Sequence, residues 1–190
     1  MGRTRTIDKE AVLDAAERVI ARDGAVGLSI DAVATEAGIS KSSVVYDYKT
    51  KKALIVAVID RHMKAEKEAL ETALAENTET PEPEIYGRIA AATQKSGYSE
   101  KERLVGLALC AAMASDAAIL QRVRDFYDKE ISSLAMRTKK PDSALLAFLA
   151  LAGLQTIEYF GFHTWEEPKR HDILERIKVL ATTDLRYSEK

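Results

Sequence analysis

The segment from Leu28 to Tyr48, LSIDAVATEAGISKSSVVYDY, predicts two short helices around a tight turn at Gly38-Ile39-Ser40. Ser29 and Ser40 are good helix N-caps, because a serine hydroxyl accepts a hydrogen bond from a free amide at the start of a helix. Gly38 can adopt the left-handed conformation that ends a helix without steric cost. A helix-turn-helix of this kind binds the major groove of DNA, although a similar corner in a small helical domain need not touch DNA.

The second of these helices offers a polar surface if Val44 and Tyr48 point inward. Short hydroxyls beside a lysine suit the phosphates and base edges of DNA. The residues left on the solvent side are then Lys41, Ser42, Ser43 and Tyr46.

The first third of the chain resembles the DNA-binding domain of the tetracycline-repressor (TetR) family of bacterial transcriptional regulators. The family pattern is A-A-x-x-x-I-A-x-x-G, then T/S-x-x-x-I-A-x-x-A-G-V-S, then a recognition helix that ends in an aromatic pair, and then K-x-K-x-x-L. Such an order and spacing is hard to reach by chance. The matching residues are Ala15-Ala16, Gly24, Ser29, Val33-Ala34, Ala37-Gly38-Ile39-Ser40-Lys41, Tyr46, Tyr48, Lys51 and Leu54.

Four positions depart from the family pattern. The family usually has an aromatic residue at Val45 and glutamate at Lys52, and often has histidine at Asp47 and glycine at Ser42. Val45 cannot donate a hydrogen bond to a phosphate, and Asp47 would repel one. We therefore expect the phosphate contacts to shift toward Tyr46, Lys49, Lys51 and Lys52.

Length and charge fit a DNA-binding head joined to a helical body. At 190 residues the chain is long for one small domain, and we predict a helix-turn-helix domain at 1–53 and an effector-binding and dimerisation domain at 54–190. The formal net charge is −2, so positive charge for DNA must be local. Arg3 and Arg5 form either a minor-groove arm or a solvated terminus, with equal weight. The expected DNA contacts are Arg3, Arg5, Ser29, Lys41, Ser42, Ser43, Tyr46, Lys49, Lys51 and Lys52.

The rest of the chain predicts an all-α protein of about nine helices, because apolar residues recur at helical spacing throughout. The first helix is expected from Asp8, as its N-cap, to Asp23, with Gly24 ending it. A long helix over about 50–76, with Thr50 as its cap, joins the three-helix head to the body. A polar loop with two prolines follows at 77–83. Further helices are expected over about 84–95, from Ser99 and from Asp116, over 142–163, and from Pro168 to about Thr182.

The helix predicted over 142–163 is apolar nearly all round, so it must bury more than one face. Resemblance to the family implies that the last two helices pair with their copies across a two-fold axis as a four-helix bundle. The alternative is the central helix of a monomeric core, and we favour the dimer. The expected interface residues are Leu145, Leu149, Ala152, Thr156, Ile173, Leu174, Ile177 and Leu180.

The same resemblance implies a small-molecule effector that binds in the body and acts on the head through the long helix. Aromatic and soft side chains are the candidates for such a site, together with two polar residues that interrupt the apolar helix. For any one of them, a place in the core or at a dimer contact is the simpler explanation. The candidates are Tyr86, Cys110, Met113, Phe126, Tyr127, Phe148, Gln155, Glu158, Tyr159, Phe162 and Trp165.

Other function classes lack their sequence signals. A single cysteine excludes an intramolecular disulfide framework, there is no signal-peptide pattern, and the apolar run from Ala144 to Leu154 is far shorter than a membrane span of roughly 20 residues. We expect a cytoplasmic protein. The three histidines lie on separate elements, with no nucleophile elbow, phosphate-binding glycine loop or HExxH motif, so we predict neither an enzyme nor a cofactor. The spacing of His163, Glu166, Glu167 and His171 matches no compact zinc pattern, and we expect no metal site.

Taken together, the sequence predicts a ligand-responsive, sequence-specific DNA-binding transcriptional regulator. The most favoured form is a homodimeric repressor that a small molecule releases from a palindromic operator. Its expected partners are double-stranded operator DNA, an effector and a second copy of the chain. The alternative is a helical interaction module in which Val45 and Asp47 have weakened DNA binding.

Overall fold

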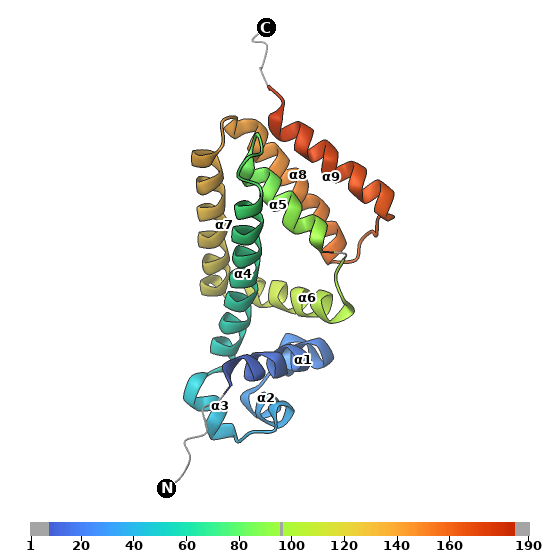
Figure 1. The fold of residues 1–190 in the computed structure, drawn as a ribbon. Helices are drawn as coiled ribbons and strands as arrows, with labels where there is room; N and C mark the ends of the chain where they lie inside the picture. The colour runs from blue at the N-terminus through green and yellow to red at the C-terminus, as the bar shows by residue number, and fades with distance from the viewer. Residues whose placement is uncertain (1–7, 96, 185–190) are drawn as a thin grey trace. The chain divides into compact units, whose positions relative to one another are not determined.

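The computed structural model describes residues 8–95 and 97–184, and this part of the chain consists of helices without strands (Figure 1). The all-α prediction is therefore confirmed, as is the expected number of about nine helices. Their bounds are α1 Lys9–Gly27, α2 Ile30–Ala37, α3 Lys41–Asp47, α4 Lys51–Glu76, α5 Pro83–Gln94, α6 Glu100–Ser115, α7 Ala117–Arg137, α8 Pro141–Tyr159 and α9 Glu167–Thr182.

The caps of the first helices are formed by the polar side chains that the sequence indicates. Asp8 accepts hydrogen bonds from the amides of Glu10 and Ala11 at the start of α1. The regular part of α1 ends at Gly24, whose φ of 70° is left-handed, and the helical run then resumes as far as Gly27. This break agrees with the helix end expected at Gly24, because glycine adopts a positive φ at little cost.

The turn between α2 and α3 has the predicted helix-turn-helix geometry. Gly38 has a φ of 65°, and the following amide of Ile39 donates to the carbonyl of Ala34 over 3.0 Å. The Oγ atoms of Ser29 and Ser40 accept from the amides of Ala32 and Ser43 over 3.1 and 3.2 Å. Both N-caps and the left-handed stop are thus in place, which fixes the direction of α3 relative to α2.

The later helices also begin at predicted capping residues. Thr50 accepts from the amide of Ala53 at the start of α4, and Asp116 accepts from that of Ala118 at the start of α7. Ser99 and Glu102 form a reciprocal capping box at α6. These side chains supply hydrogen bonds to amides that have no partner within the first turn of a helix.

The prediction that α8 extends to His163 is wrong, because α8 ends at Tyr159. Gly161 takes a φ of 68°, and the amide of Phe162 donates back to the carbonyl of Ile157 over 2.9 Å. This left-handed glycine closes the helix about four residues early, so the last turn of the expected helix is a loop.

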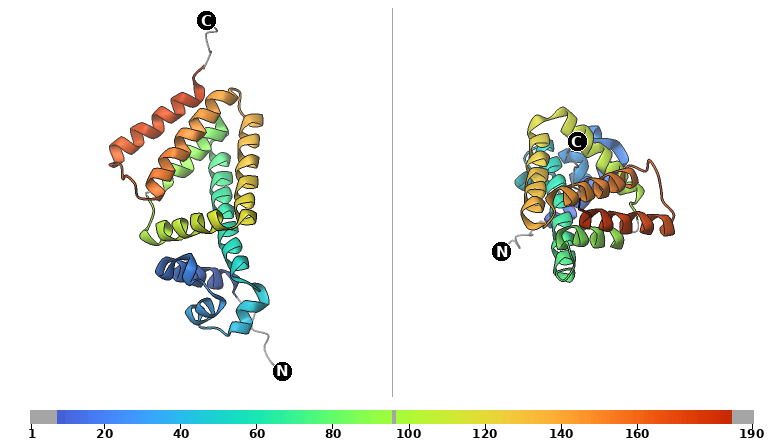
Figure 2. Two further views of the ribbon diagram at one scale, coloured as in Figure 1. Left: turned by 180° about the vertical axis from the view of Figure 1, so that it is seen from behind. Right: turned by 90° about the horizontal axis from the view of Figure 1, so that it is seen from above.

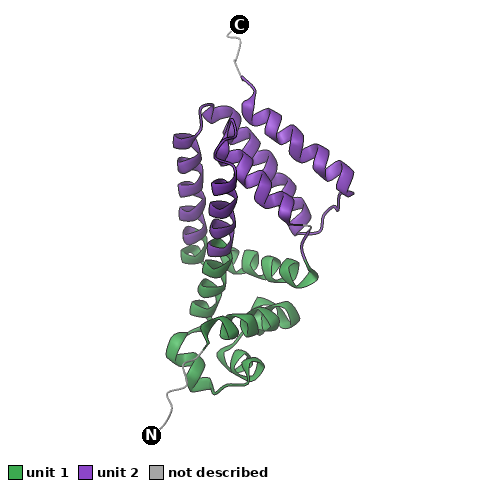
Figure 3. Cartoon of the chain, viewed as in Figure 1, with its two compact units in different colours: residues 1–63, 99–120 green, residues 64–98, 121–190 purple. Residues whose placement is uncertain are grey.

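The chain divides into two compact units (Figure 3). Of the described residues, the first unit contains 8–63 and 99–120, and the second contains 64–95, 97–98 and 121–184. The units therefore divide α4 after Met63 and group α6 with the first three helices. The domain boundary expected between residues 53 and 54 stays a prediction.

The core of the first unit forms where α1 packs against α2 and α6. Burying an aliphatic side chain of this size contributes roughly 1.5–3 kcal/mol to folding. The fully buried side chains of this unit include Val12, Val19, Ile20, Leu28, Val33, Val44, Leu54 and Val58.

The core of the second unit forms where α8 packs against α9 and α5, and both views in Figure 2 show α8 and α9 side by side. Its buried residues include Ile85, Ile89, Leu134, Ala144, Ala147, Leu151, Leu154, Leu174 and Ile177. Much of the apolar surface of α8 is thus covered within one chain.

No single helix in the described ranges is long and apolar enough to cross a membrane. The consecutive helices α6 and α7 meet such a test only as a bent pair, by length and composition.

Replacing Gly38 by alanine tests the turn between α2 and α3. An alanine there must adopt the left-handed φ of 65°, so we expect the free energy of unfolding to fall by about 1–2 kcal/mol. Urea denaturation of the purified protein measures this value. Gly38→Asn is the matched control and should cost less, because asparagine tolerates the left-handed region. Equal stability of the wild type and Gly38→Ala would contradict the assignment.

Candidate DNA-binding face and ligand cavity

The helix α3 presents an exposed face that begins directly after the turn. Val44 is fully buried and anchors the helix in the core of the first unit. The exposed fractions of Val45 and Tyr46 are 36% and 82%, and Lys41 and Ser42 are exposed one turn earlier. These four side chains share one side of the helix at the three-and-four spacing. This face can enter a groove of DNA without disturbing the core.

The serines predicted to contact DNA have local partners. Ser29 accepts from an amide of α2, as described above, and acts as a cap. The Oγ atom of Ser40 lies 2.9 Å from that of Ser42 and 2.8 Å from that of Ser43. Ser42 is exposed and Ser43 is half-buried, so Ser42 is the more accessible of the two hydroxyls on α3.

The four lysines predicted to bind phosphates differ in what holds them. Lys51 donates to the carbonyl oxygen of Val26 over 2.9 Å. Lys52 pairs with Asp116 over 2.7 Å, and Lys41 pairs with Asp31 over 2.8 Å. Lys49 is exposed and has no hydrogen bond or ion pair within the described part of the chain. Lys49 is therefore the ammonium group most available to a phosphate, whereas Lys51 ties α4 to the end of α1.

Asp47 lies in an ion pair that a single sequence does not reveal. Its carboxylate is 3.1 Å from Nζ of Lys9, and its side chain is only 10% exposed. The hydrogen bond from Lys9 raises the pKa of that lysine. The paired, largely covered carboxylate repels a phosphate less than the free aspartate that the sequence suggests. Arg3 and Arg5 lie outside the described residues.

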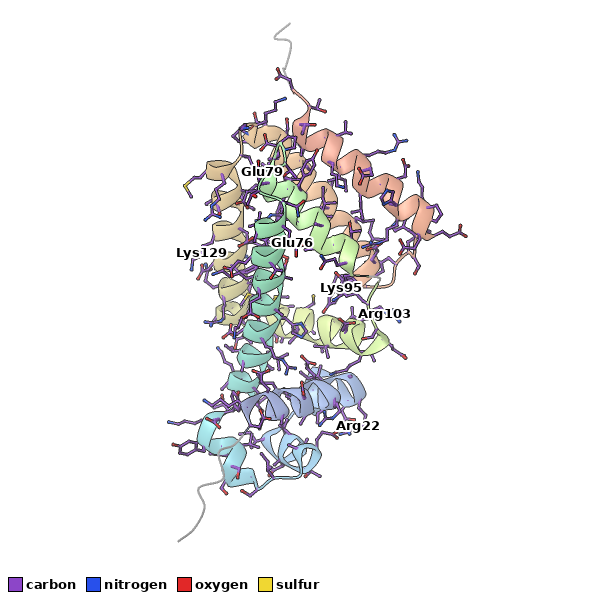
Figure 4. The ribbon with its side chains drawn as sticks, in the orientation of Figure 1. Arg22, Glu76, Glu79, Lys95, Arg103 and Lys129 are labelled. Carbon is purple, nitrogen blue, oxygen red and sulfur yellow. The ribbon has the colours of Figure 1, made fainter. Side chains whose placement is uncertain are left out.

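The helices α1 and α2 are joined by two arginines on one glutamate. Arg18 and Arg22 donate to the two carboxylate oxygens of Glu36 over 2.7 and 2.9 Å. Figure 4 labels Arg22 on α1. Each exposed pair contributes only about 0–1 kcal/mol to stability, but together they fix the second helix against the first.

A buried carboxylate joins three helices of the first unit. Glu17 of α1 is 8% exposed, and its side chain pairs with Arg61 of α4. It also lies 3.1 Å from Nε2 of His62 and 2.9 Å from Nζ of Lys101 of α6. Burial alone would raise the pKa of Glu17, but His62, Arg61 and Lys101 outweigh it and hold this pKa well below its usual range. Glu17 is therefore ionised at neutral pH.

The second unit contains a cavity of about 70 Å³ between α4, α5, α7 and α8. This volume holds several water molecules, since one water requires roughly 10–15 Å³ measured in this way. The lining is largely apolar with a few charged groups. It consists of Glu66, Lys67, Leu70, Arg88, Ala91, Phe126, Tyr127, Glu130, Phe148, Leu151, Ala152 and Gln155.

Only some of the predicted ligand residues lie at this cavity. Phe126, Tyr127, Phe148 and Gln155 line it. Ala152, which was expected at a dimer contact, lines it as well. The predicted ligand residues that the structure brings together thus all lie on α7 and α8.

The other polar and aromatic candidates have different surroundings. Glu158 forms a buried ion pair with Arg170 over 2.8 Å, and Arg170 also donates to the carbonyl of Ala92. Tyr159 packs edge-on against Tyr98. Arg170 thus fastens α9 to both α8 and α5.

The remaining candidates are also away from the cavity lining. Phe162 is 74% exposed, and Trp165 packs against the apolar core of the second unit. Tyr86 has the ammonium of Lys178 over its ring. Cys110 and Met113 belong to α6 in the first unit.

The charged lining residues Glu66, Arg88 and Glu130 were missed from the sequence. Arg88 of α5 donates to Glu130 of α7 over 2.8 Å, and its side chain is 9% exposed. Its guanidinium carbon lies 5.6 Å from the ring centre of Phe148. The sequence does indicate Arg88 as unusual, because it is the single charged residue between Ile85 and Thr93. Within residues 8–95 and 97–184, no cluster of three or more metal-ligating side chains is found.

An exposed recognition helix in a helix-turn-helix, continued through a long helix into a helical unit with a cavity, defines a DNA-binding transcription regulator. Residues 12–58 match the family described as "Bacterial regulatory proteins, tetR family", and residues 87–182 match "Tetracyclin repressor-like, C-terminal domain". The chain therefore belongs to the tetracycline-repressor family of transcriptional regulators, as its resemblance to that family predicts.

Solved structures share the fold over nearly the whole chain. A protein named as a transcriptional regulator from Pseudomonas aeruginosa PAO1 superposes with a TM-score of 0.74 at 16% identity, covering 94% of this chain and 92% of that one. A regulator from Streptomyces coelicolor A3(2) gives 0.71 at 18%, covering 92% and 98%. The multidrug binding protein EbrR, complexed with malachite green, gives 0.69 at 22%, covering 90% and 98%. No curated protein matches the sequence significantly.

Glu17→Gln should destabilise the first unit. The substitution removes the carboxylate that Arg61 and Lys101 share, although Arg61 keeps its ion pair with Asp14. We expect a loss of about 1–3 kcal/mol, which is less than for a fully buried pair because Lys101 is partly solvated. Urea denaturation at neutral pH measures this loss. Glu10→Gln is the matched control on the same helix, since Glu10 also reaches Arg61 but is 72% exposed, and its effect should stay within about 0.5 kcal/mol.

The stability that Glu17 contributes should depend on pH. Its folded-state pKa lies below the unfolded value of about 4.3, so this stabilisation is complete above about pH 5 and is lost as the pH falls through the folded-state pKa. The stability difference between the wild type and Glu17→Gln should therefore shrink below about pH 5. A constant difference down to pH 3 would contradict the ion cluster.

Proposed function

We propose that the protein is a homodimeric repressor that binds a palindromic operator in the cytoplasm and is released by a small molecule. One observation carries this proposal: the chain has an exposed recognition helix in its first unit and a largely apolar cavity in its second unit. The long helix α4 runs through both units. We favour repression over activation because a protein bound at a promoter covers the DNA there.

DNA binding rests on the exposed face of α3 and on nearby positive charge. Tyr46 and Ser42 offer hydroxyls, and Lys49 offers an ammonium without an internal partner among the described residues. Val45 offers an apolar side chain, which suits the methyl group of thymine better than a phosphate. Because the net charge of the chain is −2, binding depends on these local groups and on salt concentration.

The homodimer is supported by an exposed apolar stripe on α8. Leu146, Leu149 and Ile157 are 46%, 52% and 36% exposed, and they recur near the three-and-four spacing with the exposed Gly153 between them. Exposed apolar stripes of this kind mark interaction surfaces. A homodimer carries two recognition helices, and binding to successive half-sites requires them to lie about 34–36 Å apart.

Apart from Ala152, which lines the cavity, the predicted interface residues divide into two groups by burial. Leu149 and Thr156 are exposed, and Leu145, Ile173 and Leu180 are half-buried, so these five can contact a second copy. Leu174 and Ile177 are buried in the core of one chain and support the interface from behind.

The effector response is supported by the cavity and by its position on α4. EbrR has been seen in complex with malachite green and with ethidium, and we extend ligand binding of that general kind to this chain. Glu66 and Leu70 of α4 line the cavity, while Arg61 and His62 of the same helix contact Glu17. A ligand that binds one arrangement of α4 better by about 1–3 kcal/mol would shift the population between DNA-binding and released states.

Substitutions around α3 test DNA binding. We expect Tyr46→Ala and Lys49→Gln to weaken binding to the DNA upstream of the protein's own gene, and Lys49→Gln to reduce the salt slope by about 1. Fluorescence anisotropy at several salt concentrations measures both effects. The unfolding free energy of these variants should stay within about 0.5 kcal/mol of the wild type.

Lys51→Ala is the contrasting variant on the same surface. It removes the hydrogen bond to the carbonyl of Val26, so it should lower stability by about 0.5–1.5 kcal/mol in addition to any effect on DNA. If Tyr46→Ala and Lys49→Gln bind the DNA as tightly as the wild type, the exposed face of α3 is not the DNA-binding surface. If the wild type itself binds no specific DNA, the chain acts as a helical interaction module rather than as a repressor.

The dimer is tested by placing a charge on the exposed stripe of α8. Leu149→Lys should shift the protein from dimer to monomer in sedimentation at micromolar concentration, because an unpaired ammonium would be buried at the two-fold interface. Met136→Lys is the control, since Met136 is 79% exposed on α7 and away from the stripe. A wild-type protein that sediments as a monomer would overturn the homodimer.

A further inference from the structure

The cavity of the second unit contains four charged side chains, and protein partners balance their charges unequally. They are Glu66, Lys67, Arg88 and Glu130. Lys67 lies with its ammonium 3.6 Å from Glu71 and its side chain 63% exposed. The positive charge of Lys67 is therefore balanced by Glu71, which does not line the cavity.

The charge of Arg88 is also already balanced. Its guanidinium donates to Glu130 over 2.8 Å and sits 5.6 Å from the ring centre of Phe148. A carboxylate and an aromatic face are the two groups that stabilise an arginine in a site with little water. The pair of Arg88 and Glu130 thus adds no net charge to the cavity.

Glu66 is the carboxylate that remains. It has no hydrogen bond or ion pair within residues 8–95 and 97–184, although it lines the cavity. Glu66 is exposed to solvent, but loss of hydration around its carboxylate and the nearby Glu130 raise its pKa, and the charges of Arg88 and Lys95 offset this only in part. The cavity therefore has one carboxylate without an ion pair among the described residues, beside the aromatic rings of Phe126 and Tyr127.

We propose that this cavity binds a compact organic cation, a protonated amine carried on an aromatic or aliphatic group, with the Glu66 carboxylate as its ionic partner. The amine replaces the missing counter-charge, and the apolar group packs against Phe126, Leu70 and Leu151. An anion is disfavoured because the Glu66 carboxylate lines the cavity and the charge of Arg88 is already balanced by Glu130. The volume of about 70 Å³ is about half that of a cavity that holds benzene, roughly 150 Å³, so the ligand is small and leaves part of its apolar group at the cavity mouth.

Arg88 adds a second requirement for the ligand. Its Nε is buried and has no hydrogen-bond partner in the described part of the chain, while the side chain is 9% exposed. A buried donor without an acceptor is costly, so an oxygen atom of the ligand or a water that enters with it completes this site. Amines that also carry a hydroxyl or carbonyl oxygen satisfy both Glu66 and Arg88.

This inference specifies the effector site of the proposed repressor, and three probes of similar size and different charge test it. They are phenethylamine, 2-phenylethanol and 3-phenylpropionate, titrated into the full-length protein and followed by calorimetry or ligand-observed NMR. We expect phenethylamine to bind about tenfold more tightly than 2-phenylethanol, and 3-phenylpropionate to bind most weakly. Tighter binding of 3-phenylpropionate than of phenethylamine, or no binding of any probe at millimolar concentration, would overturn the proposal.

Variants then assign the effect to Glu66. Glu66→Gln should weaken phenethylamine about tenfold and change 2-phenylethanol by less than about twofold, because only the amine loses an ionic partner. Glu68→Gln is the matched control on the same helix, since Glu68 is exposed, pairs with Lys64 and does not line the cavity. An equal effect of Glu66→Gln and Glu68→Gln would contradict the proposal.

Filling the cavity provides an independent check of the location. Ala91→Leu adds three carbon atoms to the lining and should weaken phenethylamine and 2-phenylethanol alike, whereas unchanged binding would place the probes elsewhere. These titrations contain no DNA, so their failure is separate from that of the repressor. Amine binding that leaves DNA affinity unchanged would instead contradict the proposed effector response and leave the ligand class intact.

Discussion

The buried carboxylate of Glu17 is the contact on which the first unit depends. An ionised group away from water is stable only when opposite charges and hydrogen bonds replace its hydration. Arg61 and His62 of α4 and Lys101 of α6 provide this replacement around Glu17 of α1. Three helices that are distant in sequence must therefore meet at one point, and α1 in turn holds α2 through Arg18 and Arg22 on Glu36.

The helix α4 connects this cluster with the ligand cavity along one continuous element. Arg61 and His62 contact Glu17, and Glu66 lies about one turn further along, where it lines the cavity. A cation bound at Glu66 would change the charge next to that turn. In the account proposed above, ligand binding and the placement of the DNA-binding helices are coupled because α4 takes part in both.

Local chemistry explains why so much of the fold could be predicted from the sequence. Caps such as Ser29, Ser99 and Asp116 act over three or four residues, and Gly38 ends α2 by its own conformation. These signals lie within single segments, and the structure bears them out. The early end of α8 at the left-handed Gly161 is equally local and was overlooked because the apolar pattern continues past it.

Contacts between distant segments could not be predicted in the same way. Arg88 and Glu130 are 42 residues apart, and Lys9 and Asp47 meet only after α1 and α3 have packed. Helical spacing shows that Leu174 and Ile177 face something apolar, but not whether that surface belongs to the same chain or to a second copy. The structure places both in their own core. For the candidate cavity, the sequence likewise predicted the aromatic lining residues but not the charged ones.

The most direct test of the central claim is selection of binding sites from a random-sequence DNA library by the purified full-length protein. The account predicts enrichment of one motif made of two inverted half-sites, because two copies of α3 related by a two-fold axis read the same bases on opposite strands. Recovery of sequences without a shared motif, or of a single asymmetric half-site, would contradict the account of a dimeric, sequence-specific regulator.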